Sequence, residues 1–494
     1  PAQASFTRIT ASNDGHGLSS PNAQSIIQDS FGNIWIGNYR GGIDFISHSQ
    51  PLFNTITYQT EKYEHNCNKQ VWGLWADNNR QIWLGGEGEL GIYKEGKKIE
   101  LIPLNQCHLN KQTHVSVFHQ DKHGDLWLGT HKHGVAIYHP DTKRITCIGD
   151  DKDGSLDILC FYEDTNGKMW IGTQSGLYSA YNRELTQEDK INRLLTNKGI
   201  RSILKDKNGK LWIGAKGLFL FDEKGQLFRK LTTEQSFPIR SVNYLMEDSR
   251  KRIWVGTNDG ILVFRDASHL EDYSHYGTKE GLQNANVRAI QEDHDGTIWL
   301  STNAGISRLD EKTKTFYNYN HYDGVPMGDF MDGSTCISAD GILYFGSQGG
   351  ACYFTPSKVN SIRKPAPVTI TQFSIYDKQT ESKDAEHPLP LTDTNIQLPY
   401  NQNTFKISFN VLDYAVSSQV EFSYILEGLE NIWYYTQGEK QIIFRNIPPG
   451  HYTFKVKTRL RNQEREKRSL CAPILTRSRS RKRPVNRLPP ATRA

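Results

Sequence analysis

One four-residue pattern, apolar-aromatic-apolar-Gly, recurs along most of the chain, and a short segment of alternating apolar and polar residues precedes it. The pattern is centred on Trp35, Trp83, Trp127, Trp170, Trp212, Trp254, Trp299 and, in a degenerate last copy, Tyr344. The central aromatic residues are 42 to 48 positions apart. Recurrence at a nearly constant period indicates that the fold is assembled from similar structural units.

Two further positions recur in the same frame. An Asp lies six residues before the central Trp in the first seven copies, and Ser338 takes this position in the eighth. A Gly lies three residues before the aromatic residue in six copies, whereas Arg80 and Lys251 take this position in the other two. Asp accepts hydrogen bonds from the backbone that follows it, and Gly adopts positive φ readily. Each pair therefore predicts a tight turn between two strands of a four-stranded unit.

Four short strands in about 45 residues are typical of a blade in a β-propeller. A blade buries its faces only against its neighbours, so we expect the repeated Trp residues to serve in packing and the repeated Asp residues to form turns. The number of blades stays open. Residues 5–9 resemble a fourth strand that would complete the last blade of an eight-bladed ring. Alternatively, the ring has seven blades and the first motif is left over from an upstream propeller.

A second domain follows the last repeat. Residues 365–367, Pro-Ala-Pro, predict a linker, because proline cannot donate a hydrogen bond within a sheet. Alternating strands are expected at residues 368–371, 404–409, 421–426, 441–444 and 452–456. Short strands at this spacing predict a fibronectin- or immunoglobulin-like β-sandwich over residues 361–458. The fold class is therefore all-β, with a propeller of seven to eight four-stranded blades over residues 1–360 and the sandwich after it.

The charge of the chain is concentrated at its end. The net charge is +5, yet residues 459–494 contain 12 Lys and Arg against 2 Glu, so the remaining body is mildly acidic. This body gives no reason to expect nucleic-acid binding. We expect the basic segment, 459–494, to be a disordered or aberrant tail. No window of 18 apolar residues predicts a membrane helix, and the start lacks the pattern of a signal peptide.

The cysteines do not predict a metal centre. The chain has 7 Cys, and none forms a Cys-x-x-Cys pair. Free thiols are the expected state, and we expect no metal or other cofactor. His131 and His133 are two residues apart, but the sequence shows no further ligand near them.

The later part of the chain resembles a known family. Residues 426–429 are Leu-Glu-Gly-Leu, residues 433–435 are Trp-Tyr-Tyr, and residues 446–452 are Asn-Ile-Pro-Pro-Gly-His-Tyr. These segments resemble the triple-tyrosine (YYY) domain, and the upstream units are similar to the two-component regulator propeller repeat. The combination looks like the sensor region of hybrid two-component histidine kinases of Bacteroidetes.

The resemblance implies a periplasmic, ligand-sensing part of an inner-membrane kinase, paired as a homodimer. It implies an oligosaccharide ligand and a signal that passes through the sandwich toward a membrane segment and a kinase core that this chain lacks. We therefore expect this chain not to be an enzyme by itself. Two other functions are compatible with a propeller, a carbohydrate-active lyase or hydrolase and a scaffold for protein interactions.

Ligands of propellers usually bind at the mouth of the ring, which here includes the turns between second and third strands. These turns are short and polar, and their side chains suit hydrogen bonds to hydroxyl, carboxylate or sulfate groups. Tyr39 also offers a ring that can stack on a sugar. The candidate ligand-binding residues are Tyr39, Arg40, Glu87, His131, Lys132, His133, Gln174, Lys216, Asn258, Asp259, Asn303 and Gln348. None of them is predicted to be catalytic.

Overall fold

The computed structural model describes residues 18–48, 51–57, 70–107, 109–110, 112–148, 156–181, 183–195, 199–222, 225–235, 237–359, 368–376, 386–389, 396, 398–399, 402–412, 420–436, 439–460, 469–470 and 475–476. The chain forms two compact units, Pro51–Ser361 and a second that combines Pro1–Gln50 with Ile362–Ala494.

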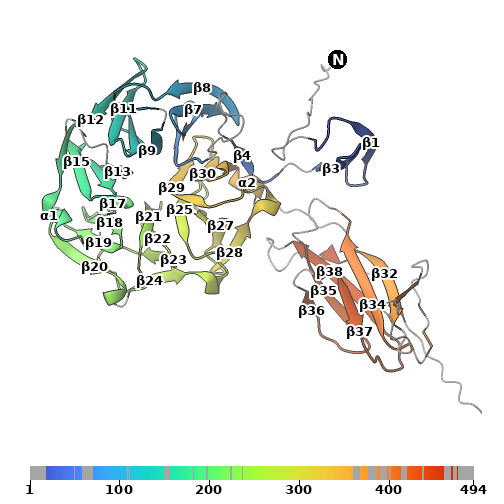
Figure 1. The fold of residues 1–494 in the computed structure, drawn as a ribbon. Helices are drawn as coiled ribbons and strands as arrows, with labels where there is room; N and C mark the ends of the chain where they lie inside the picture. Colours follow the sequence, from blue (N-terminus) through green and yellow to red (C-terminus); the bar gives the residue numbers. More distant parts are fainter. Residues whose placement is uncertain are drawn as a thin grey trace, which may run out of the picture. The chain divides into compact units, whose positions relative to one another are not determined.

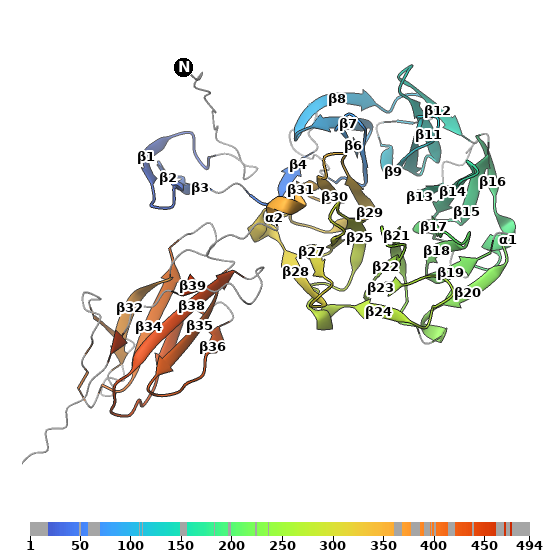
Figure 2. The same ribbon diagram turned by 180° about the vertical axis from the view of Figure 1, so that it is seen from behind.

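The first unit is a closed ring of seven four-stranded antiparallel blades (Figures 1 and 2). The innermost strands contact one another in a complete cycle, from β5 through β9, β13, β17, β21, β25 and β29 back to β5. Blade 1 consists of β5 (Gly73–Ala76), β6 (Ile82–Gly85), β7 (Glu89–Lys94) and β8 (Lys97–Pro103). Blade 2 consists of β9 (His114–Gln120), β10 (Leu126–His131), β11 (Val135–His139) and β12 (Arg144–Ile148). Blade 3 consists of β13 (Ile158–Glu163), β14 (Met169–Thr173), β15 (Leu177–Tyr181) and β16 (Glu184–Gln187).

The remaining blades follow the same order from the inside to the outside of the ring. Blades 4 to 7 consist of β17 (Ser202–Lys205), β18 (Leu211–Ala215), β19 (Gly217–Phe221), β20 (Leu227–Leu231); β21 (Val242–Glu247), β22 (Ile253–Thr257), β23 (Gly260–Phe264), β24 (Tyr273–Tyr276); β25 (Val287–Glu292), β26 (Ile298–Thr302), β27 (Gly305–Asp310), β28 (Thr315–Tyr319); β29 (Phe330–Ile337), β30 (Leu343–Ser347), β31 (Gly350–Phe354), β4 (Asn54–Ile56). Short helices are α1 (Asp189–Asn192), α2 (Pro356–Val359), η1 (Thr233–Gln235), η2 (Thr278–Glu280) and η3 (His321–Asp323).

The ring is closed by an early segment of the chain. Strand β4 pairs antiparallel with β31 and supplies the outermost strand of blade 7, with Ala351 opposite Ile56 and Tyr353 opposite Asn54. The structure thus has the seven-bladed alternative. The strand proposed for this role in an eight-bladed ring, residues 5–9, lies outside the described residues.

The first motif does not belong to the ring, which corrects the expected propeller of residues 1–360. Its strands β1 (Ala23–Gln28), β2 (Ile34–Asn38) and β3 (Gly42–Ile46) form a separate three-stranded sheet. Ile26, Ile27 and Ile43 are between 67% and 71% exposed, because this sheet lacks the flanking blades that cover such positions in the ring. The motif alone could not reveal this difference, since its residues match those of the seven blades.

The repeated Asp and Trp residues have the structural roles that the sequence predicted. Asp206 Oδ1 accepts hydrogen bonds from the backbone N–H of Asn208 and of Lys210, while Oδ2 accepts one from the indole N–H of Trp212. The same indole-to-carboxylate bond, 2.9 to 3.4 Å long, occurs in all seven copies that have both residues. Trp212, Trp254 and Trp299 are fully buried. The Asp residue therefore closes the turn and satisfies a buried donor.

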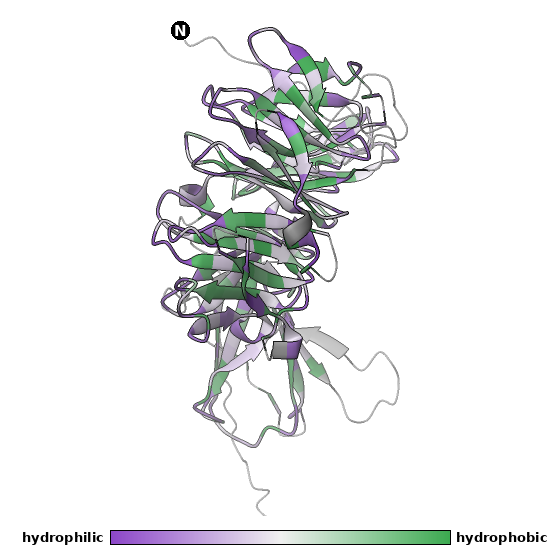
Figure 3. Cartoon of the chain, turned by 90° about the vertical axis from the view of Figure 1, so that its left-hand side faces the viewer, coloured by the Kyte–Doolittle hydropathy of each residue, from purple (hydrophilic) through white to green (hydrophobic). Residues whose placement is uncertain are grey.

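The Gly of the pattern allows neighbouring blades to approach closely. A Cβ atom on Gly85 would lie 2.2 Å from the carbonyl oxygen of Val115 in the first strand of blade 2. At Gly346 it would lie 2.4 Å from the carbonyl oxygen of Val71, so blade 7 meets blade 1 in the same way. Apolar residues of adjacent blades fill the space between the sheets, and Figure 3 shows hydrophobic residues along the strands and hydrophilic residues in many turns.

The second unit contains the expected β-sandwich. One sheet has the order β33 (Glu386–Leu389), β32 (Val368–Tyr376), β34 (Phe405–Val411), β37 (Gln441–Phe444), and the other has the order β36 (Tyr434–Thr436), β35 (Val420–Glu427), β38 (Thr453–Leu460), β39 (Ser469–Leu470), with β40 (Leu475–Thr476) also paired to β38. Phe373, Ile407, Phe409, Phe422 and Phe454 are among the residues that form its core. The alternating pattern correctly located β32, β34, β35, β37 and β38.

Two features differ from the expected boundaries of the sandwich. Strand β38 continues to Leu460, and β39 and β40 lie within the segment that we expected to be a tail. The linker at 365–367 and the basic residues 477–494 lie outside the described residues.

The five described cysteines, Cys107, Cys147, Cys160, Cys336 and Cys352, form no disulfide. Cys107 is exposed, whereas burial raises the pKa of the Cys160 thiol to about 12. Among the described residues, the structure shows no helix that is both long and apolar enough to cross a bilayer.

Candidate functional site

The mouth of the ring is formed by two kinds of segment. In each blade, the first and second strands are antiparallel, so the start of the first strand lies at the same edge as the turn between the second and third strands. In blade 5, for example, Val242 at the start of β21 pairs with Thr257 at the end of β22. The residues that enter the first strands therefore accompany the predicted turns at this edge.

A β-bulge recurs near the start of the first strands. The register shifts skip Ser116 in β9, Leu159 in β13, Asn243 in β21 and Arg288 in β25. Each of these residues lies eleven positions before the central Trp of its blade, as do Trp72 and Arg201, which directly precede β5 and β17. A bulge leaves one residue out of the ladder and redirects its side chain. The fold thus repeats one bulged position while the side chain changes from blade to blade.

The residues at this position in blades 4 to 6 join one hydrogen-bonded network. Arg201 Nη1 donates to Ser241 Oγ and to Asn243 Oδ1, both at 3.0 Å. Asn243 Nδ2 donates to Asn258 Oδ1 at 2.9 Å, to Asn286 Oδ1 at 3.0 Å and to the carbonyl oxygen of Val287 at 2.8 Å. Asn243 is fully buried, so these bonds fix the amide that connects blade 5 with blade 6.

The network continues into blade 7. Arg288 Nε donates to Asn303 Oδ1 at 2.7 Å, and Arg288 Nη1 donates to Asp332 Oδ1 at 2.8 Å. Asp332 Oδ2 lies 3.9 Å from Arg201 Nε, so one carboxylate faces two guanidinium groups. The side chains of Arg201, Arg288 and Asp332 keep 40%, 22% and 31% of their surface exposed. We call Arg201, Asn243, Asn258, Asn286, Arg288, Asn303 and Asp332 the mouth network.

A cavity of about 430 Å³ lies beside the mouth network. Its lining comes from the mouth segments of blades 3, 4 and 5 and comprises Gln174, Gly199, Arg201, Ala215, Lys216, Arg240, Ser241 and Asn258. Three of the predicted residues, Gln174, Lys216 and Asn258, are therefore brought together here. Asn303 lies in the network itself, whereas Asp259 and Gln348 are exposed in turns of the same kind in blades 5 and 7.

The predicted residues of blades 1 and 2 form a separate group. His131 Nδ1 lies 2.9 Å from Asp157 Oδ1, which also accepts the backbone N–H of Lys132 at 2.7 Å. His133 Nε2 lies 3.3 Å from Asn110 Nδ2. Glu87 Oε1 lies 3.9 Å from Nε2 of His114. Burial lowers the pKa of His114 and so favours the neutral imidazole. The nearby Glu87 carboxylate has the opposite, smaller effect.

Two predicted residues do not belong to the ring. Tyr39 and Arg40 belong to the turn between β2 and β3 of the separate three-stranded sheet. The Arg40 guanidinium lies 5.2 Å from the Tyr39 ring centroid, and Tyr39 is 50% exposed. The sequence predicted these two residues as part of the mouth because the separate sheet has the same repeated motif as the ring.

The sequence reasoning missed Arg201, Arg240, Asn243, Arg288 and Asp332. They precede or begin the first strands, whereas only the turns after the second strands were considered residue by residue. The position eleven residues before the aromatic residue carried the signal, because it holds Arg201, Asn243 and Arg288 in three consecutive blades.

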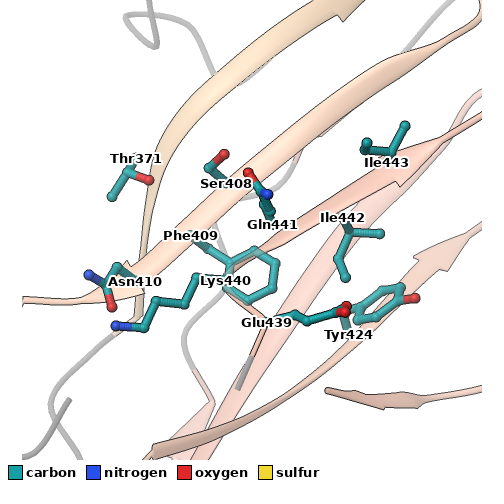
Figure 4. A pocket seen from close by; sticks show the side chains of 10 residues that line it. All are labelled: Thr371, Ser408, Phe409, Asn410, Tyr424, Glu439, Lys440, Gln441, Ile442 and Ile443. Carbon is teal, nitrogen blue, oxygen red and sulfur yellow. The ribbon is translucent and has the colours of Figure 1, made fainter. Parts of the chain in front are cut away.

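A second cavity, of about 760 Å³, lies on the sandwich. Figure 4 shows its lining, which comprises Thr371, Ser408, Phe409, Asn410, Tyr424, Glu439, Lys440, Gln441, Ile442 and Ile443. It has one acidic and one basic side chain and contains none of the predicted residues. We therefore regard the mouth of the ring as the stronger candidate site.

Comparisons with known proteins agree with this architecture. The two-component regulator propeller repeat matches residues 17–40, 154–175, 194–217, 236–259 and 281–304, and the Y_Y_Y domain matches residues 413–471. The extracellular domain of the hybrid two-component system BT3049 from B. thetaiotaomicron is 35% identical, with a TM-score of 0.84, over 96% of this chain and 64% of that one.

Two further relatives are more distant. The extracellular domain of the hybrid two-component system BT4673 from B. thetaiotaomicron is 20% identical, with a TM-score of 0.51, over 96% of this chain and 65% of that one, and it supports the fold alone. Histidine kinase P4 of Formosa agariphila is 27% identical over 191 residues, which are 38% of this chain and 13% of the kinase. This chain thus spans less than two thirds of each of these proteins. It contains two-component regulator propeller repeats and a Y_Y_Y domain, and over most of its length it is similar to the extracellular domain of a hybrid two-component system.

Proposed function

We propose that this chain is the periplasmic ligand-sensing part of a hybrid two-component histidine kinase and that it binds an oligosaccharide at the mouth of the seven-bladed ring. The observation that carries this proposal is the mouth network, in which Arg201, Asn243 and Arg288 occupy the position eleven residues before the central Trp in three consecutive blades. Such a network presents fixed hydrogen-bonding groups, which suits a ligand with many hydroxyl groups.

Blades 1 and 3 add apolar surface at the same position. Trp72 in blade 1 is 41% exposed, and Leu159 in blade 3 is half-buried. A sugar ring has polar edges and apolar C–H faces, so it is complementary to a mouth that combines an amide and guanidinium network with an exposed indole. The cavity of about 430 Å³ is within the size range of small-molecule sites.

The signal would pass from the ring to the sandwich through a rearrangement of paired sensor regions. For this, the ligand must bind more tightly to one arrangement of the homodimer than to the other. The sandwich lies after the ring in the chain, and in this proposal it transmits the change toward a membrane segment and a kinase core.

Calorimetric titration of the chain with a panel of neutral and acidic oligosaccharides tests the proposal. We expect at least one of them to bind and to be recovered chemically intact, which distinguishes a sensor from a lyase or hydrolase. Asn258→Ala should weaken binding by about tenfold, because it removes a side chain that lines the cavity and accepts from Asn243.

The matched control is Asn208→Ala, in an exposed residue of the turn between β17 and β18 at the opposite edge of blade 4. It should leave the affinity unchanged. Binding that is equally weakened by both variants, or no binding by any saccharide of the panel, would contradict the proposal.

A further inference from the structure

The cavity beside the mouth network is lined by three cationic side chains, Arg201, Lys216 and Arg240. Its other polar side chains, Gln174, Ser241 and Asn258, are neutral, and the described lining contains no carboxylate. Like charges gathered in one concave site repel one another, and an anion that enters the site removes this repulsion.

Asp332, the acidic member of the mouth network, does not neutralise the cavity. Asp332 is hydrogen-bonded to Arg288 at 2.8 Å and lies farther, 3.9 Å, from Arg201. Lys216 and Arg240 have neither an ion pair nor a side-chain hydrogen bond among the described residues. The described lining of the cavity therefore carries positive charge and no negative charge.

The orientation of Arg201 makes it suitable for an anionic ligand. Its Nη1 atom is held by Ser241 and Asn243, and its Nε atom faces Asp332. Its Nη2 group has no hydrogen-bond partner among the described residues. The guanidinium is thus fixed by protein groups on one side, and its remaining N–H groups are available to a carboxylate or sulfate oxygen.

We infer that the oligosaccharide is acidic and that its carboxylate or sulfate group binds in this cavity, between Arg201, Lys216 and Arg240. This inference rests on the proposed function and names the class of ligand. The acidic group occupies the cationic cavity, while Gln174 and Asn258 bind neighbouring hydroxyl groups. Hydrogen bonds between ionised partners are about twice as strong as neutral ones, so the acidic group contributes strongly to affinity.

The experiment compares ligands that differ only in charge. The full chain is titrated calorimetrically with tetragalacturonic acid and with its fully methyl-esterified form, which has the same backbone and no negative charge. Chondroitin tetrasaccharides with and without sulfate, a neutral cello-tetrasaccharide and inorganic sulfate complete the series. We expect an acidic saccharide to bind at least tenfold more tightly than its uncharged counterpart, with an affinity that falls as salt is added.

Two variants locate the acidic group. Lys216→Gln and Arg240→Gln should each weaken the acidic saccharide by about tenfold and leave neutral saccharides within twofold. The matched control, Lys207→Gln, lies in the exposed turn at the opposite edge of blade 4 and should change nothing. Thermal unfolding of each variant verifies that it is folded.

The outcomes separate this inference from the proposed function. Neutral and acidic saccharides that bind equally well, with no effect of Lys216→Gln, would overturn the inference and leave the proposed function intact. Inorganic sulfate that binds as tightly as any acidic saccharide would also overturn it, because the cavity would then recognise the anion alone. Failure of every saccharide to bind would overturn both.

Discussion

The indole N–H of Trp212 donates a 2.9 Å hydrogen bond to Oδ2 of Asp206, the residue that also closes the turn before the Trp strand. Both residues are buried, and the relationship recurs in six of the seven blades. It joins the local turn to the packing between blades, because the same carboxylate satisfies the turn backbone and the buried ring.

Asp206→Ala should therefore destabilise the ring by about 2 to 4 kcal/mol. The substitution leaves a fully buried indole N–H without its acceptor and removes two hydrogen bonds to the turn. Denaturant unfolding monitored by tryptophan fluorescence measures the change in the free energy of unfolding. The control Asp222→Ala removes a turn carboxylate that accepts a backbone bond from Gln226, and the residue six positions later is Phe228 in place of Trp. An equal loss in both variants would show that the indole bond contributes nothing.

Gly85→Ala should destabilise the ring by about 2 kcal/mol or more. Its new Cβ atom would lie 2.2 Å from the carbonyl oxygen of Val115, so the backbone of blade 1 or blade 2 would have to move. Gly85 does not have a positive φ, so the effect is steric. Thermal unfolding checks this prediction. A variant as stable as the original chain would mean that neighbouring blades can separate without cost.

Arg80→Gly should stabilise the ring by about 1 kcal/mol. Arg80 takes the turn position that is Gly in most copies and has a φ of 61° there, in the left-handed region that costs an L-residue about 1 kcal/mol or more. The reciprocal variant Gly124→Ala, at a φ of 90° and with no atom within 4 Å of its Cβ, should destabilise by a similar amount. Chemical denaturation of both variants measures these opposite changes, and shifts in the same direction would contradict the explanation.

The free energy of unfolding should fall as the pH falls below the ordinary pKa of histidine, near 6.5. Burial lowers the pKa of His119, and the hydrogen bond to Glu163 opposes this effect only in part. The unfolded chain then binds a proton at a pH where the folded chain does not, so stability rises with pH between the lowered pKa and about 6.5. The same holds for His114.

Thermal unfolding between about pH 5 and about pH 7.5 measures this dependence. The double variant His114→Gln, His119→Gln should flatten the profile in this window by at most about 1.4 kcal/mol per pH unit for each histidine. A profile that keeps its slope in the double variant would assign the dependence to other groups.

Much of the fold could be predicted from the sequence, because the residues that form the turns and the residues that pack between blades recur together in each repeat. The Asp residue, the turn Gly and the Trp residue all act within one blade, so a single motif revealed the strands and the role of each residue. The count of blades could not be settled in this way. Trp35 bonds to Asp29 in the same way as each Trp residue of the ring bonds to its own Asp residue. The strand pairing shows that its sheet is separate and that β4 completes the seventh blade.

The candidate site was predictable only in part. The turns after the second strands contain Gln174, Lys216 and Asn258, which the structure does place around one cavity. Arg201 and Arg240 come from segments that enter the first strands, and their approach to these turns depends on the packing of adjacent blades. The bulge at Asn243 and Arg288 is likewise a property of the register between strands and leaves no mark in the hydrophobic pattern.

The pairing of β4 with β31 has a consequence for how the molecule is made. During synthesis, β4 emerges before any other part of the ring, and its partner in blade 7 emerges last. Until then β4 has no ladder to join, and the six earlier blades have no closed cycle to stabilise them. The circle is completed in a single late step, and a shortened chain that starts after Ile56 would leave the backbone of β31 open to pairing with other molecules.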